Sequence, residues 1–255
     1  MTGVVLQARI DSSRLPGKAL LLLDGKPMIF RVMEALNHVK SDLRILACPE
    51  DSISVFKPLA DEAGFHIISG SKNDVLKRYC KVIRLFSLDR VIRATGDNPF
   101  VFADAASVLN DEAAAINADY SGYSGLPYGA GVESVSAAAL LRAENEAVTD
   151  FDREHVCPYL YNNPEKFRLH RPLAPPQWRD YSEQFSFNSG QLTAGSEQLT
   201  VNKTQSNIRV TVDTPEDYER AVTLYDALKN EPEMYCGAVI IRVFSRVFAE
   251  IKRSS

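Results

Sequence analysis

Residues 3–18 read GVVLQARIDSSRLPGK, an apolar run that passes directly into a polar and basic loop. The apolar part is short and bounded by polar residues, which is typical of a buried strand. The loop carries Arg9 and Arg14 together with two serines, a glycine and a lysine, and a helical pattern opens after it at Pro27. A strand, a charged loop and a helix in this order indicate an α/β protein.

The same alternation continues through the first half of the chain. Apolar runs predict further strands at 43–48, 65–68 and 89–95, and apolar residues at helical spacing predict helices at 27–40, 51–63, 73–86 and 104–116. Repeated β-α-β-α units predict a mostly parallel sheet sandwiched by helices. Ligands of such sheets bind at the carboxyl ends of the strands, so we expect the site just after residues 9, 68 and 95.

The second half of the chain is less regular. We expect a Gly- and Tyr-rich loop at 120–133, helices at 136–147 and 152–163, a strand at 208–212, a helix that begins at Thr214-Pro215, and either one amphipathic helix or a strand and a helix at 238–253. Residues 178–207 are polar and predict a flexible insertion. The chain, 1–255, is expected to form one domain, with an extension after about residue 234.

Composition excludes several classes of protein. The 255 residues include 29 Lys and Arg against 33 Asp and Glu, a formal net charge of −4, which argues against a nucleic-acid binder. The N-terminal apolar run reaches Arg9 too soon for a signal peptide or a membrane helix. Four cysteines lie far apart without a CxxC pair, so we expect reduced buried thiols in a cytoplasmic protein, and no zinc site.

The loop at 9–18 is the first candidate for chemistry. Hydroxyls, a glycine and backbone N–H groups can cradle phosphate oxygens, while Arg and Lys neutralise their charge. The loop is not a Walker A motif, because Ser12 stands where its first glycine belongs and Ala19 follows Lys18. A basic loop that is merely solvated is the alternative interpretation.

Asp97 and Asp213 are the second candidate. Each closes or directly follows an apolar run that predicts a strand, so both carboxylates are expected beside the same crevice. Two carboxylates there can hold Mg²⁺, which prefers oxygen ligands and keeps waters that a nucleotide's phosphates replace. An aspartate at a strand end can also serve only as a turn former or a helix cap.

Five motifs, in order along the chain, resemble those of the cytidylyltransferase family, which includes the CMP-KDO and CMP-sialic acid synthetases. The resemblance is greatest to its spore-coat polysaccharide biosynthesis F-type branch. The motifs are QARIDSSRLPGKAL at 7–20, GSKNDVLKR at 70–78, RATGDNP at 93–99, DREHV at 152–156 and VDTPED at 212–217. The resemblance extends from residue 3 to about residue 228.

The resemblance implies a Rossmann-like fold of the nucleotide-diphospho-sugar transferase (GT-A-like) type and transfer of CMP from CTP to a small-molecule acceptor, with release of pyrophosphate. It also implies Mg²⁺ on Asp97 and Asp213 and a homodimer without nucleic-acid or membrane partners. On this basis we expect catalysis by Lys18 and Arg14. The remaining expected contacts are, for the nucleotide, Ala8, Arg9, Ser12, Ser13, Gly17, Asp74 and Arg93, and, for the acceptor, Tyr128, Glu133, Arg153, Glu154 and His155.

The sequence also departs from the family pattern and leaves alternatives open. No acidic residue precedes Glu133 within 129–132, and neither the predicted insertion nor the tail after 234 has a family counterpart. These differences bear on the acceptor, which can be a sugar acid, a sugar phosphate or a non-sugar phosphate. A metal-dependent glycosyltransferase needs a DxD motif, which Asp97-Asn98-Pro99 lacks. A nucleotide-binding subunit without turnover is the third class, against which the retained basic and acidic residues argue.

Overall fold

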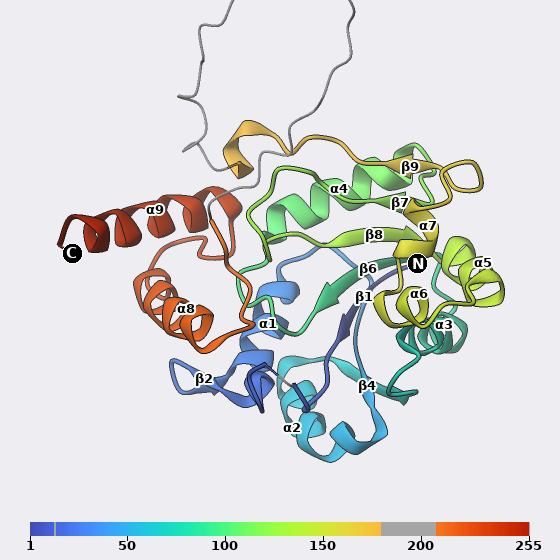
Figure 1. Ribbon diagram of the computed structural model, residues 1–255, viewed down its shortest axis with the longest axis horizontal. Helices are drawn as coiled ribbons and strands as arrows, with labels where there is room; N and C mark the ends of the chain where they lie inside the picture. The colour runs from blue at the N-terminus through green and yellow to red at the C-terminus, as the bar shows by residue number, and fades with distance from the viewer. Residues whose placement is uncertain (13, 180–207, 255) are drawn as a thin grey trace, which may run out of the picture.

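A computed structural model of the protein describes residues 1–12, 14–179 and 208–254. Among these residues seven strands form the central sheet, in the order β5-β4-β1-β6-β8-β7-β9 (Figure 1). The parallel part consists of β5 (His66–Gly70), β4 (Leu43–Pro49), β1 (Thr2–Gln7) and β6 (Arg90–Thr95). Beyond β6 follow β8 (Glu133–Ser136), antiparallel to β6, then β7 (Tyr120–Ser121) and β9 (Leu169–His170). The predicted mostly parallel, Rossmann-like sheet is confirmed.

Side chains of β1 alternate between two buried faces of this sheet. Val4 and Leu6 pack on α1 (Met28–Asn37), α2 (Ile53–Ala63) and α4 (Ala103–Ala115). Val5 packs on the opposite side, whose cover is formed by α3 (Val75–Phe86), α5 (Ala137–Glu146) and α7 (Pro158–Tyr161). Burial on both faces explains why the parallel strands are continuous apolar runs in the sequence.

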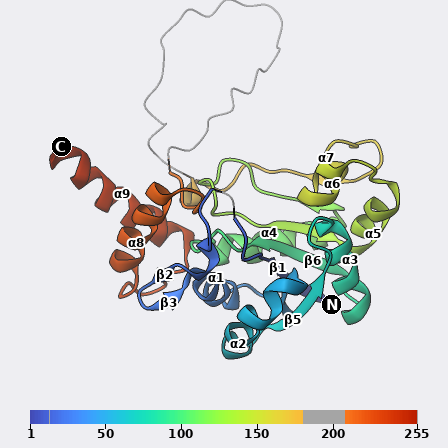
Figure 2. The same ribbon diagram turned by 60° about the horizontal axis from the view of Figure 1, so that its bottom comes forward.

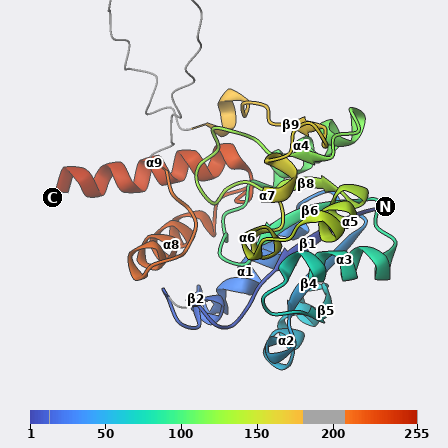
Figure 3. The same cartoon turned by 45° about the vertical axis from the view of Figure 1, so that its right-hand side comes forward.

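A third hydrophobic cluster lies beside the sheet, where α8 (Pro215–Leu228) packs against α9 (Gly237–Ser254). Figures 1 and 2 place these two helices together on one side of the molecule, opposite α5 and α7. Residues 238–253 therefore belong to one helix, and Figure 3 shows it running alongside α8 and projecting beyond it. The short helix η3 (Pro176–Trp178) joins this cluster through Trp178, whose Nε1 donates to Asp104 Oδ2 at 2.8 Å.

Two predicted elements are wrong. The helix expected at 152–163 is two helices, α6 (Asp150–His155) and α7, because Val156 between them has a φ of 74°. The strand expected at 208–212 does not form, and only an isolated parallel bridge joins Arg209 to Tyr128. Of the predicted insertion, residues 180–207 lie outside the described part of the chain.

The remaining short elements are η1 (Lys18–Leu20), the hairpin of β2 (Leu22–Leu23) and β3 (Lys26–Pro27), and η2 (Glu50–Ser52). Within the described ranges, no helix has the length and apolar character that crossing a membrane requires.

Candidate active site

A cleft of about 710 Å³ opens at the carboxyl ends of β1 and β6, where the sequence predicts the site. This volume lies within the range of small-molecule sites. The loop after β1, the turn after β6 and the 120–133 segment supply most of its wall. Twelve of the residues predicted for the site line it: Ala8, Arg9, Ser12, Arg14, Lys18, Arg93, Asp97, Tyr128, Glu133, Glu154, His155 and Asp213.

Gly17 gives the loop after β1 its turn. Its φ of 67° lies in the left-handed region, where glycine carries no Cβ penalty, and it precedes η1 directly. The turn brings Lys18 back to the cleft with its side chain only 16% exposed. Gly17 itself does not line the cleft, so its part in the site is conformational. Ser13 lies outside the described residues.

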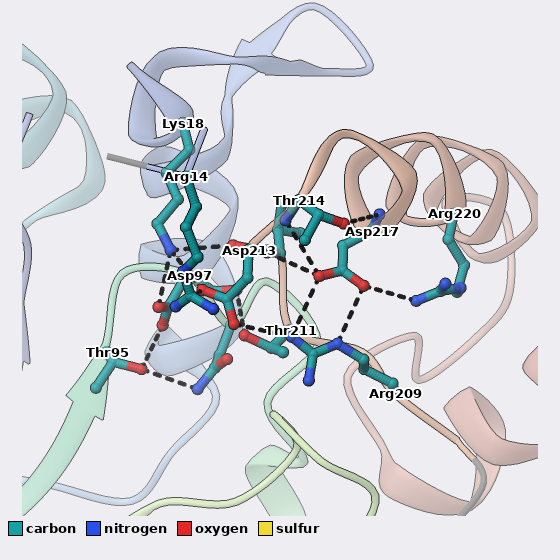
Figure 4. A network of polar contacts seen from close by, with 12 residues as sticks. Arg14, Lys18, Thr95, Asp97, Arg209, Thr211, Asp213, Thr214, Asp217 and Arg220 are labelled. Atoms are coloured by element: carbon teal, nitrogen blue, oxygen red, sulfur yellow. Dashed lines mark hydrogen bonds and ion pairs between the residues drawn. The ribbon is translucent and has the colours of Figure 1, made fainter. Parts of the chain in front are cut away.

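Lys18 joins the two predicted metal ligands. Its Nζ donates to Asp97 Oδ2 and to Asp213 Oδ1, both at 3.0 Å (Figure 4). It also donates to the Val212 carbonyl oxygen at 3.1 Å. Asp97 is itself oriented by Thr95, whose Oγ1 donates to Asp97 Oδ1 at 2.6 Å. The amide of Val212 donates to the Asp97 carbonyl oxygen at 2.9 Å, which brings the two segments together. The prediction that both carboxylates share one crevice is therefore confirmed as geometry.

Three cationic side chains surround the buried carboxylate of Asp213. Besides Lys18, Arg14 Nη2 donates to Oδ1 at 3.0 Å and Arg209 Nη2 donates to Oδ2 at 2.9 Å. A buried carboxylate needs such compensation, since an unpaired charge in this position costs several kcal/mol. Arg14 is 68% exposed, which leaves it free to rotate toward a ligand in the cleft.

The donor chemistry between Asp97 and Asp213 fits a divalent cation. Two carboxylate oxygens and one carbonyl oxygen converge on the cationic nitrogen of Lys18, and these are the ligand types that Mg²⁺ prefers. In the described part of the chain, no group of three or more His, Cys, Asp or Glu residues gathers as a metal cage. A cation on this pair would therefore take its other ligands from water or from phosphate oxygens.

Asp74 and Arg153 face each other rather than the cleft. Asp74 caps α3 by accepting from the Lys77 amide at 2.9 Å, and its Oδ2 pairs with Arg153 Nη2 at 2.7 Å. Arg153 also donates to the carbonyl oxygens of Glu144 and Ala147. The structure thus assembles these two predicted ligand contacts into a clamp between α3 and α6. The next residues of α6, Glu154 and His155, do line the cleft.

Arg93 and Glu133 form a partly buried ion pair across β6 and β8. Tyr120 donates its hydroxyl to Glu133 Oε1 at 2.8 Å, and burial together with this carboxylate raises the pKa of Tyr120. Burial also raises the pKa of the neighbouring Cys157 thiol, so Cys157 stays protonated and unreactive. The wall of the cleft on this side is thus a polar surface held in place by an ion pair and a hydrogen bond.

Several buried polar atoms around the cleft form no hydrogen bond within the described part of the chain. Six such side-chain atoms occur among the described residues, and four belong to residues that line the cleft: Gln7 Oε1, Arg78 Nε, Arg93 Nε and Asn98 Oδ1. Unsatisfied buried groups are costly and uncommon in native proteins. Their concentration here indicates a surface that is completed by a polar ligand.

Sequence reasoning missed four basic residues of the site. Lys72, Arg78 and Arg171 line the cleft, and Arg209 holds Asp213 from behind. Arg78 and Lys72 fall within the 70–78 motif, which could have identified them as site residues. Arg171 and Arg209 belong to no motif that would have done so. With Lys72, Arg78 and Arg171, seven Lys and Arg among the described residues line the cleft against five Asp and Glu, although the whole chain is acidic. The cleft is thus the local basic pocket that a phosphate ligand requires.

A mostly parallel α/β sheet with a basic cleft at its strand ends places the protein in the Rossmann-like class, whose members bind ligands at this edge of the sheet. Comparison with known families gives the particular one. Residues 4–239 match the family model described as cytidylyltransferase. The chain belongs to the cytidylyltransferase family and is a nucleotidyltransferase enzyme.

Individual relatives agree with this assignment. The spore coat polysaccharide biosynthesis protein SpsF of Bacillus subtilis (strain 168) is 28% identical over 243 residues, which cover 92% of this chain and 91% of that protein. A 3-deoxy-manno-octulosonate cytidylyltransferase of Alteromonas mediterranea is 31% identical over 102 residues, 40% of this chain and 41% of that protein.

Two solved structures share the fold. A cytidylyltransferase from Leptospira borgpetersenii superimposes with a TM-score of 0.79 at 20% identity and covers 100% of this chain and 97% of its own. A CMP:2-keto-3-deoxy-manno-octonic acid synthetase complexed with CTP gives 0.61 at 16% identity, with coverage of 88% and 98%. The fold type expected from the motifs is thereby confirmed.

Proposed function

We propose that this enzyme transfers CMP from CTP to a sugar acid, a sugar phosphate or a related acceptor and releases pyrophosphate. The observation that carries the proposal is Lys18, held between Asp97 and Asp213 on the wall of a basic cleft. Similarity to the spore coat protein supports a role in the synthesis of a surface polysaccharide. Similarity to the octulosonate cytidylyltransferases supports CTP as the nucleotide.

The reaction requires an acceptor oxygen to attack the α-phosphorus of CTP. A bond forms between that oxygen and phosphorus, and the bond from phosphorus to the oxygen that leads to the β-phosphate breaks, so that pyrophosphate leaves. Such in-line transfer depends on positioning and on neutralising charge. Lys18 is best placed to stabilise the charge that develops on the α-phosphate oxygens, and Arg14 and Arg9 hold the triphosphate. The backbone around Ala8 and the 70–78 segment read the cytosine.

We propose that Mg²⁺ is the cofactor, held by Asp97 and Asp213. When bound, the cation supplies positive charge to phosphate oxygens. The protein's own contribution is to present two fixed carboxylates, one oriented by Thr95 and one by Arg209. Tyr128, Glu133 and the α6 residues Glu154 and His155 also line the cleft and are left to contact the acceptor.

Turnover with defined substrates tests this function. Pyrophosphate release is measured with CTP, Mg²⁺ and a panel containing a sugar acid, a sugar phosphate and a non-sugar phosphate. We expect release to require CTP and one class of acceptor together. Consumption of a UDP-sugar without pyrophosphate would indicate a glycosyltransferase instead. Nucleotide binding without turnover of any acceptor in the panel would favour a non-catalytic subunit.

A further inference from the structure

Arg209 links the carboxylate of Asp213 to a second buried carboxylate, that of Asp217. Its Nη2 donates to Asp213 Oδ2 at 2.9 Å, while Nε donates to Asp217 Oδ1 at 3.0 Å (Figure 4). The side chains of Asp213 and Asp217 are only 8% and 4% exposed. One planar guanidinium therefore spans two acids in a fixed geometry, which a lysine ammonium cannot reproduce.

Asp217 is a rigid anchor for this guanidinium. Its Oδ2 accepts from the backbone amides of Asp213 at 3.0 Å and Thr214 at 3.2 Å, as the N3 residue of the capping box that starts α8. Arg220 also donates to Asp217 Oδ1, at 2.9 Å. The start of α8 thus fixes Asp217, and Asp217 in turn fixes Arg209.

Tyr128 fixes the guanidinium of Arg209 from the cleft side. Its ring lies 4.7 Å from the guanidinium carbon, and its backbone pairs with Ile208 and Val210. The two backbones approach so closely that a Cβ on Gly129 would lie 2.5 Å from the Thr211 amide nitrogen, and Gly129 has a φ of 95°. Only glycine fits this position, so the contact between the two segments is built into the backbone.

We propose that Arg209 is a positioning residue that holds Oδ2 of Asp213 and thereby presents Oδ1 toward Asp97 as a ligand for a divalent cation. The proposal rests on the metal site of the proposed function. Ligating carboxylates are commonly oriented by such hydrogen bonds, and loss of the partner weakens metal binding by about 10–100-fold. Charge alone predicts the opposite effect on metal affinity, because removing the positive charge of Arg209 would strengthen the binding of another cation nearby.

The test is Mn²⁺ binding to the nucleotide-free protein, followed by the electron paramagnetic resonance signal of free Mn²⁺. Arg209→Lys keeps the positive charge but loses the planar guanidinium that spans both acids, so we expect its dissociation constant for Mn²⁺ to rise about 10–100-fold. The matched control is Arg220→Lys, because Arg220 binds Asp217 but does not touch Asp213. Its dissociation constant should stay within about twofold of wild type. Tyr128→Leu changes an exposed side chain and should weaken binding about two- to fivefold, the value of one exposed cation–π contact.

Each outcome decides the proposal. Binding by Arg209→Lys within twofold of wild type would overturn it, and so would equal losses in Arg209→Lys and Arg220→Lys. If Arg209→Lys does not fold, unchanged binding by Tyr128→Leu overturns it. Asp213→Asn separates the metal site from the role of Arg209. Loss of Mn²⁺ binding in this variant would establish the metal site even if Arg209 has no part in it. Absence of Mn²⁺ binding to wild type would count against the metal site itself.

Discussion

Lys18 is the residue on which the two halves of the site meet. It comes from the loop after β1, whereas its two carboxylate partners follow β6 and precede α8. A flexible ammonium in this position can exchange carboxylate oxygens for phosphate oxygens without moving the backbone. The loop can therefore bind a phosphate through a side chain that already lies in the cleft.

Lys18→Ala should remove most turnover and leave the fold intact. Loss of one donor to a developing oxyanion lowers kcat by about 10²–10³-fold. Asp213 retains Arg14 and Arg209, so we expect a small change in melting temperature. The matched control is Lys26→Ala, which breaks a surface pair with Glu62 and should leave kcat unchanged. An activity of Lys18→Ala within twofold of wild type would remove Lys18 from the mechanism.

Asp97→Asn and Asp213→Asn test the carboxylates separately. Each keeps the shape of the side chain but loses the charge that balances Mg²⁺ beside a triphosphate. We expect both variants to need far more Mg²⁺ or to fail to turn over, as measured by Mg²⁺ titration of pyrophosphate release. If Asp213 is only structural, Asp213→Asn will lower the melting temperature and leave the Mg²⁺ dependence unchanged.

The residues of the site differ in how far the sequence predicts them. Lys18 and Asp97 follow from one rule, that the carboxyl ends of parallel strands share an edge, and the structure brings them together. Asp213 lies at the same edge although the strand expected before it does not form, because Val212 pairs with the backbone of Asp97. The pairing of Asp74 with Arg153 depends instead on how α3 packs against α6, across 79 positions of sequence. No local pattern contains that contact, whereas the family motifs at 70–78 and 152–156 led to the prediction that both residues contact ligands.

At the scale of elements, α8 begins as its sequence predicts. Thr214 accepts from the Asp217 amide at 3.2 Å, Asp217 returns the contact, and Pro215 occupies the first helical position. Burial alone would raise the pKa of Asp217, but hydrogen bonds from Arg209, the Asp213 amide and Arg220 lower it to about 2. The ionised carboxylate of Asp217 in the capping box therefore also stabilises the folded protein electrostatically.

Asp217→Asn should lower the free energy of unfolding by about 2 kcal/mol at pH 7, from a pKa depressed from 3.8 to about 2. Because the folded pKa is the lower one, this contribution is complete above about pH 4 and is lost as pH falls toward 2. Urea unfolding at pH 7 and pH 3 measures it, with Asp226→Asn on the same helix as the control, expected within about 0.5 kcal/mol. A difference between wild type and Asp217→Asn that does not shrink at low pH contradicts this account.

The segment at 208–212 shows why a strand pattern can be read correctly and still mislead. Ile208, Val210 and Val212 are buried, as the alternation predicts. Their backbone partners, however, are the Tyr128 segment and the Asp97 turn, which are not strands. A periodicity reports which side chains are buried but not what pairs with the backbone. The break in the predicted helix at Val156 is of the same kind, since a positive φ at valine is imposed by tertiary structure.

For the whole molecule we predict a homodimer. Val148, just before α6, and Phe151, in its first turn, are 89% and 59% exposed, which is unusual for large apolar side chains. The Phe151 ring lies against His155, which lines the cleft. Light scattering should give twice the chain mass of 28.3 kDa. Phe151→Asp should shift the particle toward the monomer, whereas Leu85→Asp, at an exposed apolar position on α3, should not. A wild-type mass of one chain at micromolar concentration would refute the dimer.

The choice of nucleotide is also a property of the whole cleft. The triphosphate is common to all four nucleotides, so Arg9, Arg14 and Lys18 cannot discriminate among them. Discrimination must come from the base, which on our proposal lies against the backbone at Ala8 and the 70–78 segment. We therefore predict that CTP with Mg²⁺ stabilises the protein more than ATP, GTP or UTP does.

CTP at 100 times its dissociation constant should add about 2.7 kcal/mol to the free energy of unfolding, which for a chain of this length raises Tm by roughly 5–10 °C. Differential scanning fluorimetry with the four nucleotides at equal concentration measures it. Lys18→Ala serves as the control, because loss of a phosphate contact should reduce the shift for every nucleotide and preserve their order. Equal shifts for all four nucleotides in wild type would contradict recognition of cytosine and would leave a site that reads phosphate alone.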